Sequence, residues 1–373
     1  MKNLALISFL LLTAFFTSCD LLESSEDDVQ LDLEFDLSGA QAIMLQNSSS
    51  NGRVSGTTTN LFKVDTEGNV SPVVDDVSVY LVRTLPKGLY IEIYVGSNRK
   101  RFYALFDNSF TEIKEKVGNY FLGANENGDL VFSDFSIFRF DSKTIEKPQT
   151  TLSDPSVQSL SRNLAVITDY SIFQVFNTVS NVRYNIQGCN GPQVEAFMGN
   201  EKALVNDCTN EAIMDMTDGS RTGIEEFSQW NHETLPLEEG IIVLTQGRGG
   251  SNFYGLSLVT AEGNRTFLTD DIFQPGSTTC SNCGDPNTVL YGAEQFLVIR
   301  ELNKVSVVDR NNNNIVTSIL DGLNVTNISL EGTLVYYLAE DNMGTPITGV
   351  YDLSNGENTV LDNQTQYDDI QTF

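Results

Sequence analysis

The chain has 373 residues, of which 22 are basic and 50 acidic, and its formal net charge is -28. A surface this acidic repels nucleic acid phosphates and anionic lipid headgroups, so it excludes nucleic-acid binding. Hydrophobic residues still make up 40% of the chain, with 22 Phe and 13 Tyr, which indicates a large folded core rather than disorder.

Residues 1–18 contain one lysine, Lys2, followed by a nearly unbroken apolar run. Two small residues, Thr17 and Ser18, stand directly before Cys19. This pattern predicts a secretory signal peptide rather than a membrane-spanning helix. A cysteine in this place resembles the lipobox of bacterial lipoproteins, although Phe16 replaces the usual leucine. The resemblance implies cleavage before Cys19, lipidation of Cys19 and anchoring in the bacterial outer membrane, on its periplasmic face or at the cell surface. The alternative is an ordinary signal peptide whose product happens to begin with cysteine.

Residues 19–28 form a short acidic tether in which two serines precede Glu26-Asp27-Asp28. Serine followed by acids close to the lipidated cysteine resembles the surface-export signal of Bacteroidetes lipoproteins; the alternative is a solvated spacer. Apolar and polar residues then alternate over 29–37, which predicts a half-buried strand.

From there on the chain repeats a unit of short strands separated by polar turns. Seven strand starts, each after a Gly- or Asn-containing turn, lie at residues 88, 128, 162, 200, 240, 294 and 332, with spacings of 40, 34, 38, 40, 54 and 38. In several hairpins an apolar strand ends at an aspartate and a Gly or Asn turn follows, as at Asp65, Asp309 and Asp352. A period of ~40 residues built from short strands is typical of β-propeller blades.

The fold expected is therefore all-β: a single β-propeller over residues 29–373 with four-stranded antiparallel blades, eight blades preferred and seven as the alternative. An eighth blade requires help from both ends of the chain. Residues 42–46 are expected to form its second strand, and residues 368–373 to return as its inner strand. The strand at 29–37 competes for that inner position.

Four cysteines remain after Cys19, an even number that indicates two disulfides in an exported protein. The preferred pairing of the three that exist is Cys189 with Cys208 and Cys280 with Cys283. A zinc site is an alternative, but only Cys280 and Cys283 have the usual ligand spacing. A redox role for that pair is the other alternative.

No catalytic residue, metal site or cofactor is predicted. The single histidine, His232, stands near the single tryptophan, Trp230, and both are expected in a connection between blades that is a candidate binding loop. The acidic turns 65–69 and 125–129 contain oxygen ligands, but hairpin chemistry explains them without calcium.

Three segments are candidate binding loops: 96–101, 246–252 and 272–288. The first contains the basic triplet Arg99, Lys100 and Arg101, interpreted either as a patch for an anionic partner or as a charged guard on a strand-connecting turn. The second contains Arg248 in a glycine-rich stretch that lacks the following helix of a phosphate site.

The sequence thus predicts a membrane-anchored envelope lipoprotein that acts as a non-enzymatic binding module for an envelope protein or an extracellular ligand. A lipid-anchored propeller of this size resembles the scaffold subunit of the outer-membrane barrel-assembly machinery, but that family's tryptophan-ending repeats are missing here. The alternative is a glycan-active enzyme with paired carboxylates in the propeller funnel.

Overall fold

The computed structural model describes residues 34–48, 58–74, 78–95, 98–114, 120–150, 156–161, 163–169, 172–185, 193–199, 201–207, 210–224, 231–237, 239–246, 254–269, 289–292, 295–301 and 304–373. The chain divides into two units, Met1–Glu34 and Phe35–Phe373, and the described strands belong to the second. Within the described residues, no helix has the length and apolar character needed to cross a membrane.

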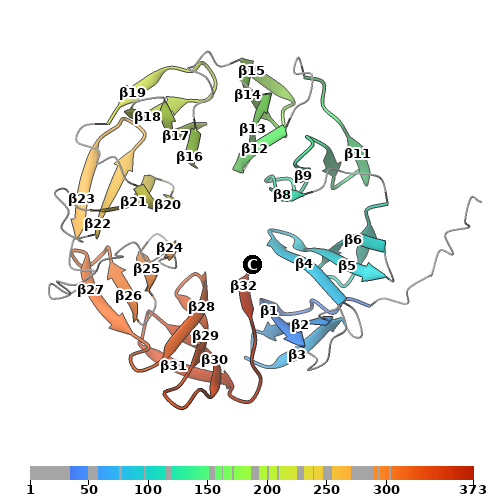
Figure 1. Ribbon diagram of the computed structural model, residues 1–373, viewed down its shortest axis with the longest axis vertical. Coiled ribbons are helices and arrows are strands. Elements are labelled where there is room, and N and C mark those ends of the chain that lie inside the picture. The colour runs from blue at the N-terminus through green and yellow to red at the C-terminus, as the bar shows by residue number, and fades with distance from the viewer. Residues whose placement is uncertain are drawn as a thin grey trace, which may run out of the picture. The chain divides into compact units, whose positions relative to one another are not determined.

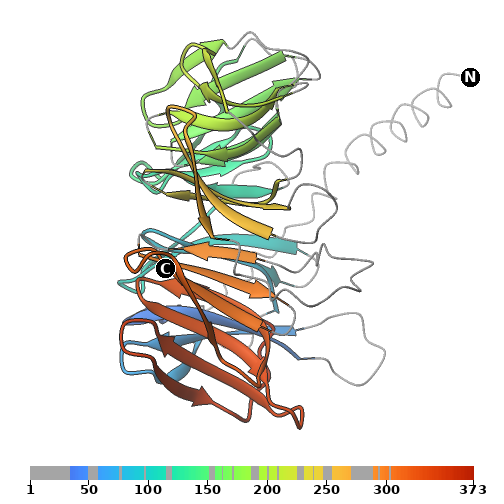
Figure 2. The same ribbon diagram turned by 90° about the vertical axis from the view of Figure 1, so that its left-hand side faces the viewer.

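The described strands form eight four-stranded antiparallel sheets arranged in a ring, which is an eight-bladed β-propeller (Figure 1). The predicted all-β fold is confirmed, and of the two predicted blade numbers the structure has eight. Figure 2, turned by 90°, shows the strands running from one face of the ring to the other.

Seven blades are each formed by four consecutive strands, which follow one another from the innermost position to the outermost. They are β4 (Ser78–Leu85), β5 (Gly88–Val95), β6 (Asn98–Leu105) and β7 (Phe110–Glu112); β8 (Phe121–Ala124), β9 (Leu130–Phe132), β10 (Ile137–Arg139) and β11 (Thr144–Glu146); β12 (Ser156–Ser161), β13 (Leu164–Asp169), β14 (Ile172–Asn177) and β15 (Val182–Asn185); β16 (Gln193–Phe197), β17 (Lys202–Asp207), β18 (Asn210–Asp215) and β19 (Arg221–Gly223); β20 (Asn231–Leu237), β21 (Gly240–Gln246), β22 (Tyr254–Thr260) and β23 (Arg265–Thr269); β24 (Val289–Gly292), β25 (Phe296–Glu301), β26 (Lys304–Asp309) and β27 (Ile315–Ile319); and β28 (Asn324–Glu331), β29 (Leu334–Glu340), β30 (Pro346–Asp352) and β31 (Glu357–Asp362).

The eighth blade combines both ends of the unit. Its order is β32 (Asp369–Thr372), β1 (Ala40–Ser48), β2 (Thr58–Asp65) and β3 (Val70–Val74), with β32 innermost and the C-terminus near the middle of the ring (Figure 1). Ile43 pairs with Gln371 and Met44 with Ile370. The predicted closure, with the last residues as inner strand and 42–46 in the second strand, is confirmed.

The strand predicted over 29–37 is wrong in its described part, because residues 34–37 belong to no strand. The expected alternation of burial is nevertheless present, since Phe35 and Leu37 are buried and Asp36 is exposed. In this described part a single backbone hydrogen bond, from Asp36 N to Val73 O (2.9 Å), links the segment to β3, which is too little to form a ladder.

The seven strand starts found from the sequence all introduce second strands: β5, β9, β13, β17, β21, β25 and β29. A second strand is covered on both faces by neighbouring blades, so it appears in sequence as an unbroken apolar run. In β21, for example, Ile241 to Leu244 are fully buried. Gly88 and Gly240 open two of these strands because a Cβ there would collide with the backbone carbonyl of Ala104 or Val259 on the third strand.

Aspartates at the ends of third strands cap the following turns. The Oδ1 atoms of Asp65, Asp215, Asp309 and Asp352 each accept a hydrogen bond from the backbone N–H two residues on, at 2.8–3.1 Å. These are Asx turns, which replace a backbone hydrogen bond by a side-chain one. The aspartate repeat seen in the sequence is therefore a structural feature of one face of the ring.

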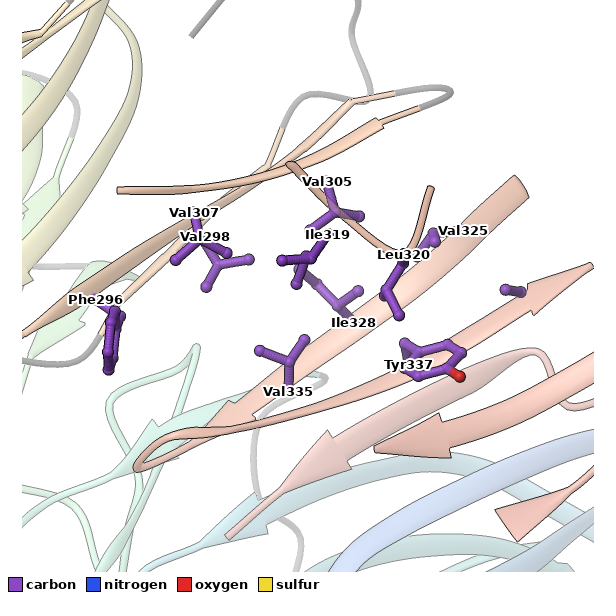
Figure 3. Close-up of a cluster of buried hydrophobic side chains, with 11 residues drawn as sticks. Phe296, Val298, Val305, Val307, Ile319, Leu320, Val325, Ile328, Val335 and Tyr337 are labelled. Atoms are coloured by element: carbon purple, nitrogen blue, oxygen red, sulfur yellow. The ribbon is translucent and has the colours of Figure 1, made fainter. Parts of the chain in front are cut away.

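Hydrophobic side chains fill the space between neighbouring blades. Figure 3 shows the cluster between the β24–β27 and β28–β31 blades. Its buried members are Phe296, Val298, Val305, Val307, Ile319, Leu320, Val325, Ile328, Val335, Tyr337 and Ala339. Because each blade needs a neighbour on both sides, the ring must close for every blade to be covered.

Candidate functional site

A buried carboxylate organises one end of the β4–β7 blade. Glu92 is 1% exposed and accepts a hydrogen bond from the Tyr90 hydroxyl at 2.5 Å. Its two carboxylate oxygens form ion pairs with Arg99 Nε at 3.1 Å and Arg101 Nε at 3.3 Å. One carboxylate thus pairs with two guanidinium groups from the neighbouring strand. Burial and the Glu92 carboxylate together raise the pKa of Tyr90, so its hydroxyl remains a donor.

Two exposed tyrosines extend this centre to the surface. Tyr80 on β4 and Tyr94 on β5 are 52% and 43% exposed, and their rings meet edge to face with centroids 5.5 Å apart. The guanidinium carbon of Arg99 lies 5.1 Å from the centroid of Tyr80. We call Tyr80, Tyr90, Glu92, Tyr94, Arg99 and Arg101 the tyrosine–arginine cluster. Strand backbones and a buried ion pair hold its exposed rings in place, which favours binding because little side-chain freedom remains to be lost.

The basic triplet lies in a different place from the one expected. Arg99, Lys100 and Arg101 belong to β6, the third strand of the blade, rather than to a turn. Pairing of Tyr94 with Arg99 and of Glu92 with Arg101 puts both arginines on the face of Glu92, and alternation puts Lys100 on the other face, 3.5 Å from Glu112. Sequence analysis identified the basic residues but missed Glu92. The available signal was that Glu92 is the single acidic residue in an otherwise apolar strand.

Replacing Glu92 by glutamine is expected to lower the free energy of unfolding by about 2 kcal/mol, because two half-buried guanidinium groups lose an ion pair with a buried carboxylate. Chemical denaturation followed by tryptophan and tyrosine fluorescence measures this. Glu357→Gln, at an exposed carboxylate on β31, is the matched control and is expected to change little. Equal stability of the two variants would contradict a supporting role for Glu92.

Polar residues also line four consecutive innermost strands: Glu233 on β20, Tyr291 on β24, Asn327 on β28 and Asp369 on β32. Asn327 Nδ2 donates to Asp369 Oδ1 at 2.7 Å, which joins two blades beside the axis. Burial raises the pKa of the Tyr291 hydroxyl; Arg300 opposes this, and Asp369 and Glu233 add to it. Asp369 and Glu233 thus influence Tyr291 from two other innermost strands.

A pair of interacting carboxylates lies in the β16–β19 blade. Burial raises the pKa of Glu211 on β18 to about 8, the negative charge of Glu195 on the innermost strand β16 contributes to the rise, and Arg265 opposes both. A carboxyl that is protonated at neutral pH can donate a proton to a bound molecule. The expectation of paired carboxylates named no residues, because the chain has too many acids to choose from.

Glu211 predicts a measurable pH dependence. Its folded pKa of about 8 exceeds the ordinary 4.5, so the folded state binds the proton more tightly and stability falls as pH rises from about 4.5 to about 8. Relative to wild type, Glu211→Gln is expected to lose this decline and to melt at a higher temperature at pH 8. Thermal unfolding of both proteins at pH 5, 6.5 and 8 measures it. Parallel pH profiles would contradict the raised pKa.

Several predicted site residues lie outside the described part of the chain: Cys19, Cys189, Cys208, Cys280, Cys283, Trp230 and Arg248. Lipidation, both disulfides and the roles of 246–252 and 272–288 therefore stay predictions. The backbone of His232 is described and lies in strand β20 rather than in a connection between blades, at a register shift between Asn231 and Glu233.

The two turns considered as calcium loops use their oxygens internally. Asp65 Oδ1 accepts the backbone N–H groups of Glu67 and Asn69, each at 2.9 Å. Asp129 binds Arg139 Nη1 at 3.0 Å and the backbone N–H of Phe140 at 2.8 Å. Among the residues that the structure describes, no group of three or more His, Cys, Asp or Glu is placed to hold a metal ion.

A shallow depression of about 460 Å³ lies between the β20–β23 and β24–β27 blades. It is lined by Glu239, Leu268, Arg310, Asn311 and Asn314. An ion pair between Arg310 and Glu239 crosses it and links the two blades. The pairing makes this depression a polar seam of the ring.

Comparisons with known proteins bear on the fold alone. No protein-family model and no curated protein matches the sequence. The structure is similar to dipeptidyl peptidase 4 of Porphyromonas gingivalis, with a TM-score of 0.51 and 10% identity over 83% of this chain and 57% of that chain. A quinonprotein alcohol dehydrogenase-like protein of Bacteroides thetaiotaomicron is similar with a TM-score of 0.44 and 10% identity, over 89% of this chain and 77% of that chain. PorZ, a surface component of the Porphyromonas gingivalis type-IX secretion system, is similar with a TM-score of 0.39 and 9% identity, over 75% of this chain and 44% of that chain. The chain spans less than two thirds of the peptidase and of PorZ.

Proposed function

We propose that the protein is a membrane-anchored envelope lipoprotein whose propeller is a non-enzymatic binding module for an envelope protein or an extracellular ligand. The observation that carries this proposal is the tyrosine–arginine cluster, in which exposed aromatic rings are held rigidly over a buried ion pair. Tyrosine and arginine are the side chains that most often dominate binding energy at interfaces. The propeller supplies a stable frame, and nothing in this arrangement requires a reaction.

Site-specific photo-crosslinking in intact cells tests the binding role. A photoreactive phenylalanine analogue replaces Tyr94 in one variant and Phe267, 57% exposed on the outer strand β23, in the control. We expect a recurrent adduct at position 94 that is absent at position 267 and is lost when Tyr80→Ala is added. Adducts that are the same at both positions, or none at position 94, would count against the proposal.

Membrane anchoring has its own test. Cys19→Ser is expected to move the protein from the membrane fraction to the soluble envelope fraction, because the acyl chains on Cys19 supply the attachment. Radiolabelled palmitate incorporation into wild type but not the variant is the second readout. A variant that stays in the membrane fraction would show that anchoring does not depend on this lipid.

A glycan-active enzyme is the second candidate, and the interaction of Glu195 with Glu211 favours it. Glycoside hydrolysis needs a protonated carboxyl as general acid, and the raised pKa of Glu211 keeps this carboxyl protonated at neutral pH. Release of reducing ends from a panel of bacterial and host glycans, lost in both Glu195→Gln and Glu211→Gln, would favour this candidate over the binding module.

A further inference from the structure

The β4–β7 blade is taller than the blade that follows it in the ring. Strands β4, β5 and β6 have eight residues each, whereas β8, β9 and β10 have four, three and three. Each blade of a propeller covers a face of its neighbour. These short strands therefore leave part of the taller sheet without a covering strand.

Ring contacts between the two blades show how far the cover extends. The ring of Tyr90 on β5 stacks on that of Phe121 on β8, with centroids 4.1 Å apart, and meets that of Phe132 on β9 at 6.1 Å. Tyr94 shares the face of Tyr90 but stands about 13 Å further along β5, at roughly 3.3 Å per residue. Its ring contact is with Tyr80 of its own blade.

Burial at this end of β5 differs between the two faces of the sheet. Ile91 and Ile93, which alternate to the other face, are 0% exposed, whereas Tyr94 is 43% exposed and Tyr80 on β4 is 52% exposed. One face of the blade is therefore covered up to this end, and the other is not. We call the uncovered surface formed by Tyr80, Tyr94 and Arg99 the step; it is the exposed part of the tyrosine–arginine cluster.

The polar groups of the step are mainly hydrogen-bond donors. A guanidinium such as that of Arg99 has donors only, and each tyrosine hydroxyl can donate. The carboxylate oxygens beneath them, those of Glu92, already interact with Tyr90, Arg99 and Arg101. A ligand that matches the step therefore offers acceptors and has few donors of its own.

The two rings of the step form a corner. Their planes lie at 77° with centroids 5.5 Å apart, and the Arg99 guanidinium lies over the Tyr80 ring at 5.1 Å. Rings at this angle share no plane, so the flat face of one sugar ring cannot stack on both. A compact, puckered apolar group, such as the pyrrolidine ring of proline, can contact both rings at once.

We propose that the step binds a proline-rich segment of a partner protein in the polyproline II conformation. This inference rests on the proposed function and names its partner class. Proline has a backbone acceptor but no N–H donor, and polyproline II leaves its carbonyl groups unpaired, which matches the donors of the step. Aromatic-lined surfaces recognise such pre-formed segments at low entropic cost. The net charge of -28 favours segments that carry Lys or Arg beside the prolines.

Fluorescence anisotropy of labelled peptides with the purified full-length protein tests the proposal. The probe is octaproline with a lysine at each end, and the matched peptide has alternating glycine and serine in place of proline. We expect the proline probe to bind at least about 10-fold more tightly than the matched peptide. Its Kd is expected to rise by about 10-fold or more in Tyr80→Ala and in Tyr94→Ala. Phe267→Ala, at a side chain 57% exposed on β23, is the control and is expected to bind as wild type does.

Three outcomes would overturn the inference: no saturable binding of the proline probe, equal binding of the glycine–serine peptide, or a Kd that neither tyrosine variant changes. Circular dichroism verifies that each variant is folded. Binding of a neutral hexasaccharide in place of the proline probe, lost in the same variants, would overturn it in favour of an extracellular glycan. A specific cross-link at position 94 without proline binding would leave the binding module intact with a partner of other chemistry, so the two proposals fail separately.

Discussion

Phe35→Ala is expected to lower the free energy of unfolding by about 3 to 5 kcal/mol, the usual cost of removing a buried phenylalanine. The side chain is 2% exposed, and its ring centroid lies 5.7 Å from that of Phe102 and 5.2 Å from that of Phe110. Its loss leaves a cavity against the β4–β7 blade that the rigid strands cannot close.

The effect should be large because Phe35 sits at the junction between the closing blade and its neighbour. Asp36 N bonds to Val73 O on β3, and the next N–H, that of Leu37, donates to Asn108 Oδ1 beside β6 at 2.8 Å. Lys63 on β2 adds an ion pair to Asp36 at 2.8 Å. The segment thus fastens two blades to each other without belonging to either sheet.

Urea denaturation monitored by circular dichroism measures the change, and Phe267→Ala is the control. Phe267 is 57% exposed, so its truncation is expected to change stability by no more than about 0.5 kcal/mol. A similar small effect at both positions would mean that the junction contributes little to holding the ring closed.

The second large effect is expected at Arg139, where Arg139→Met should cost about 3 to 5 kcal/mol. Arg139 Nη1 bonds to Asp129 Oδ2 at 3.0 Å and to the Thr178 carbonyl at 2.6 Å, and Nη2 bonds to Asn181 Oδ1 at 2.7 Å. The guanidinium therefore joins the β8–β11 and β12–β15 blades. Without it, the buried Asp129 loses its ion pair with Arg139.

A double-mutant cycle separates this cause from loss of packing. When Asp129→Asn is added to Arg139→Met, the carboxylate that has lost its ion pair is removed. The free energy of unfolding is then expected to rise by at least about 1 kcal/mol relative to Arg139→Met. The same substitution in wild type is expected to destabilise. Additive effects of the two substitutions would show that the ion pair contributes no coupling energy and that the cost of Arg139→Met comes from its packing and its other hydrogen bonds.

The sequence predicted the architecture well because blades repeat. The second strand of a blade is covered on both faces and follows a turn that contains Gly or Asn. This pattern recurs at similar spacing, so it could be recognised seven times. The closing blade was predictable because its third-strand hairpin at 61–74 needed further strands, and 42–46 and 368–373 were available at opposite ends of the unit. The strand over 29–37 was predicted wrongly in its described part, 34–37, because alternating burial also arises when a single extended segment packs against two blades.

The site was less predictable, for identifiable reasons. Glu92 was missed because its role depends on ion pairs with Arg99 and Arg101 on the neighbouring strand. The pairing register that brings these residues together cannot be deduced from either segment alone. His232 attracted attention as the single histidine, yet its position in the ring depends on the same unseen register.

Closure by β32 also sets the timing of folding. The four residues of β32 must pair with β1, which lies more than 300 positions earlier in the chain. The closing blade therefore lacks its innermost strand until β32 has formed, so its completion requires contacts between residues far apart in the chain and is expected to be a slow step of folding.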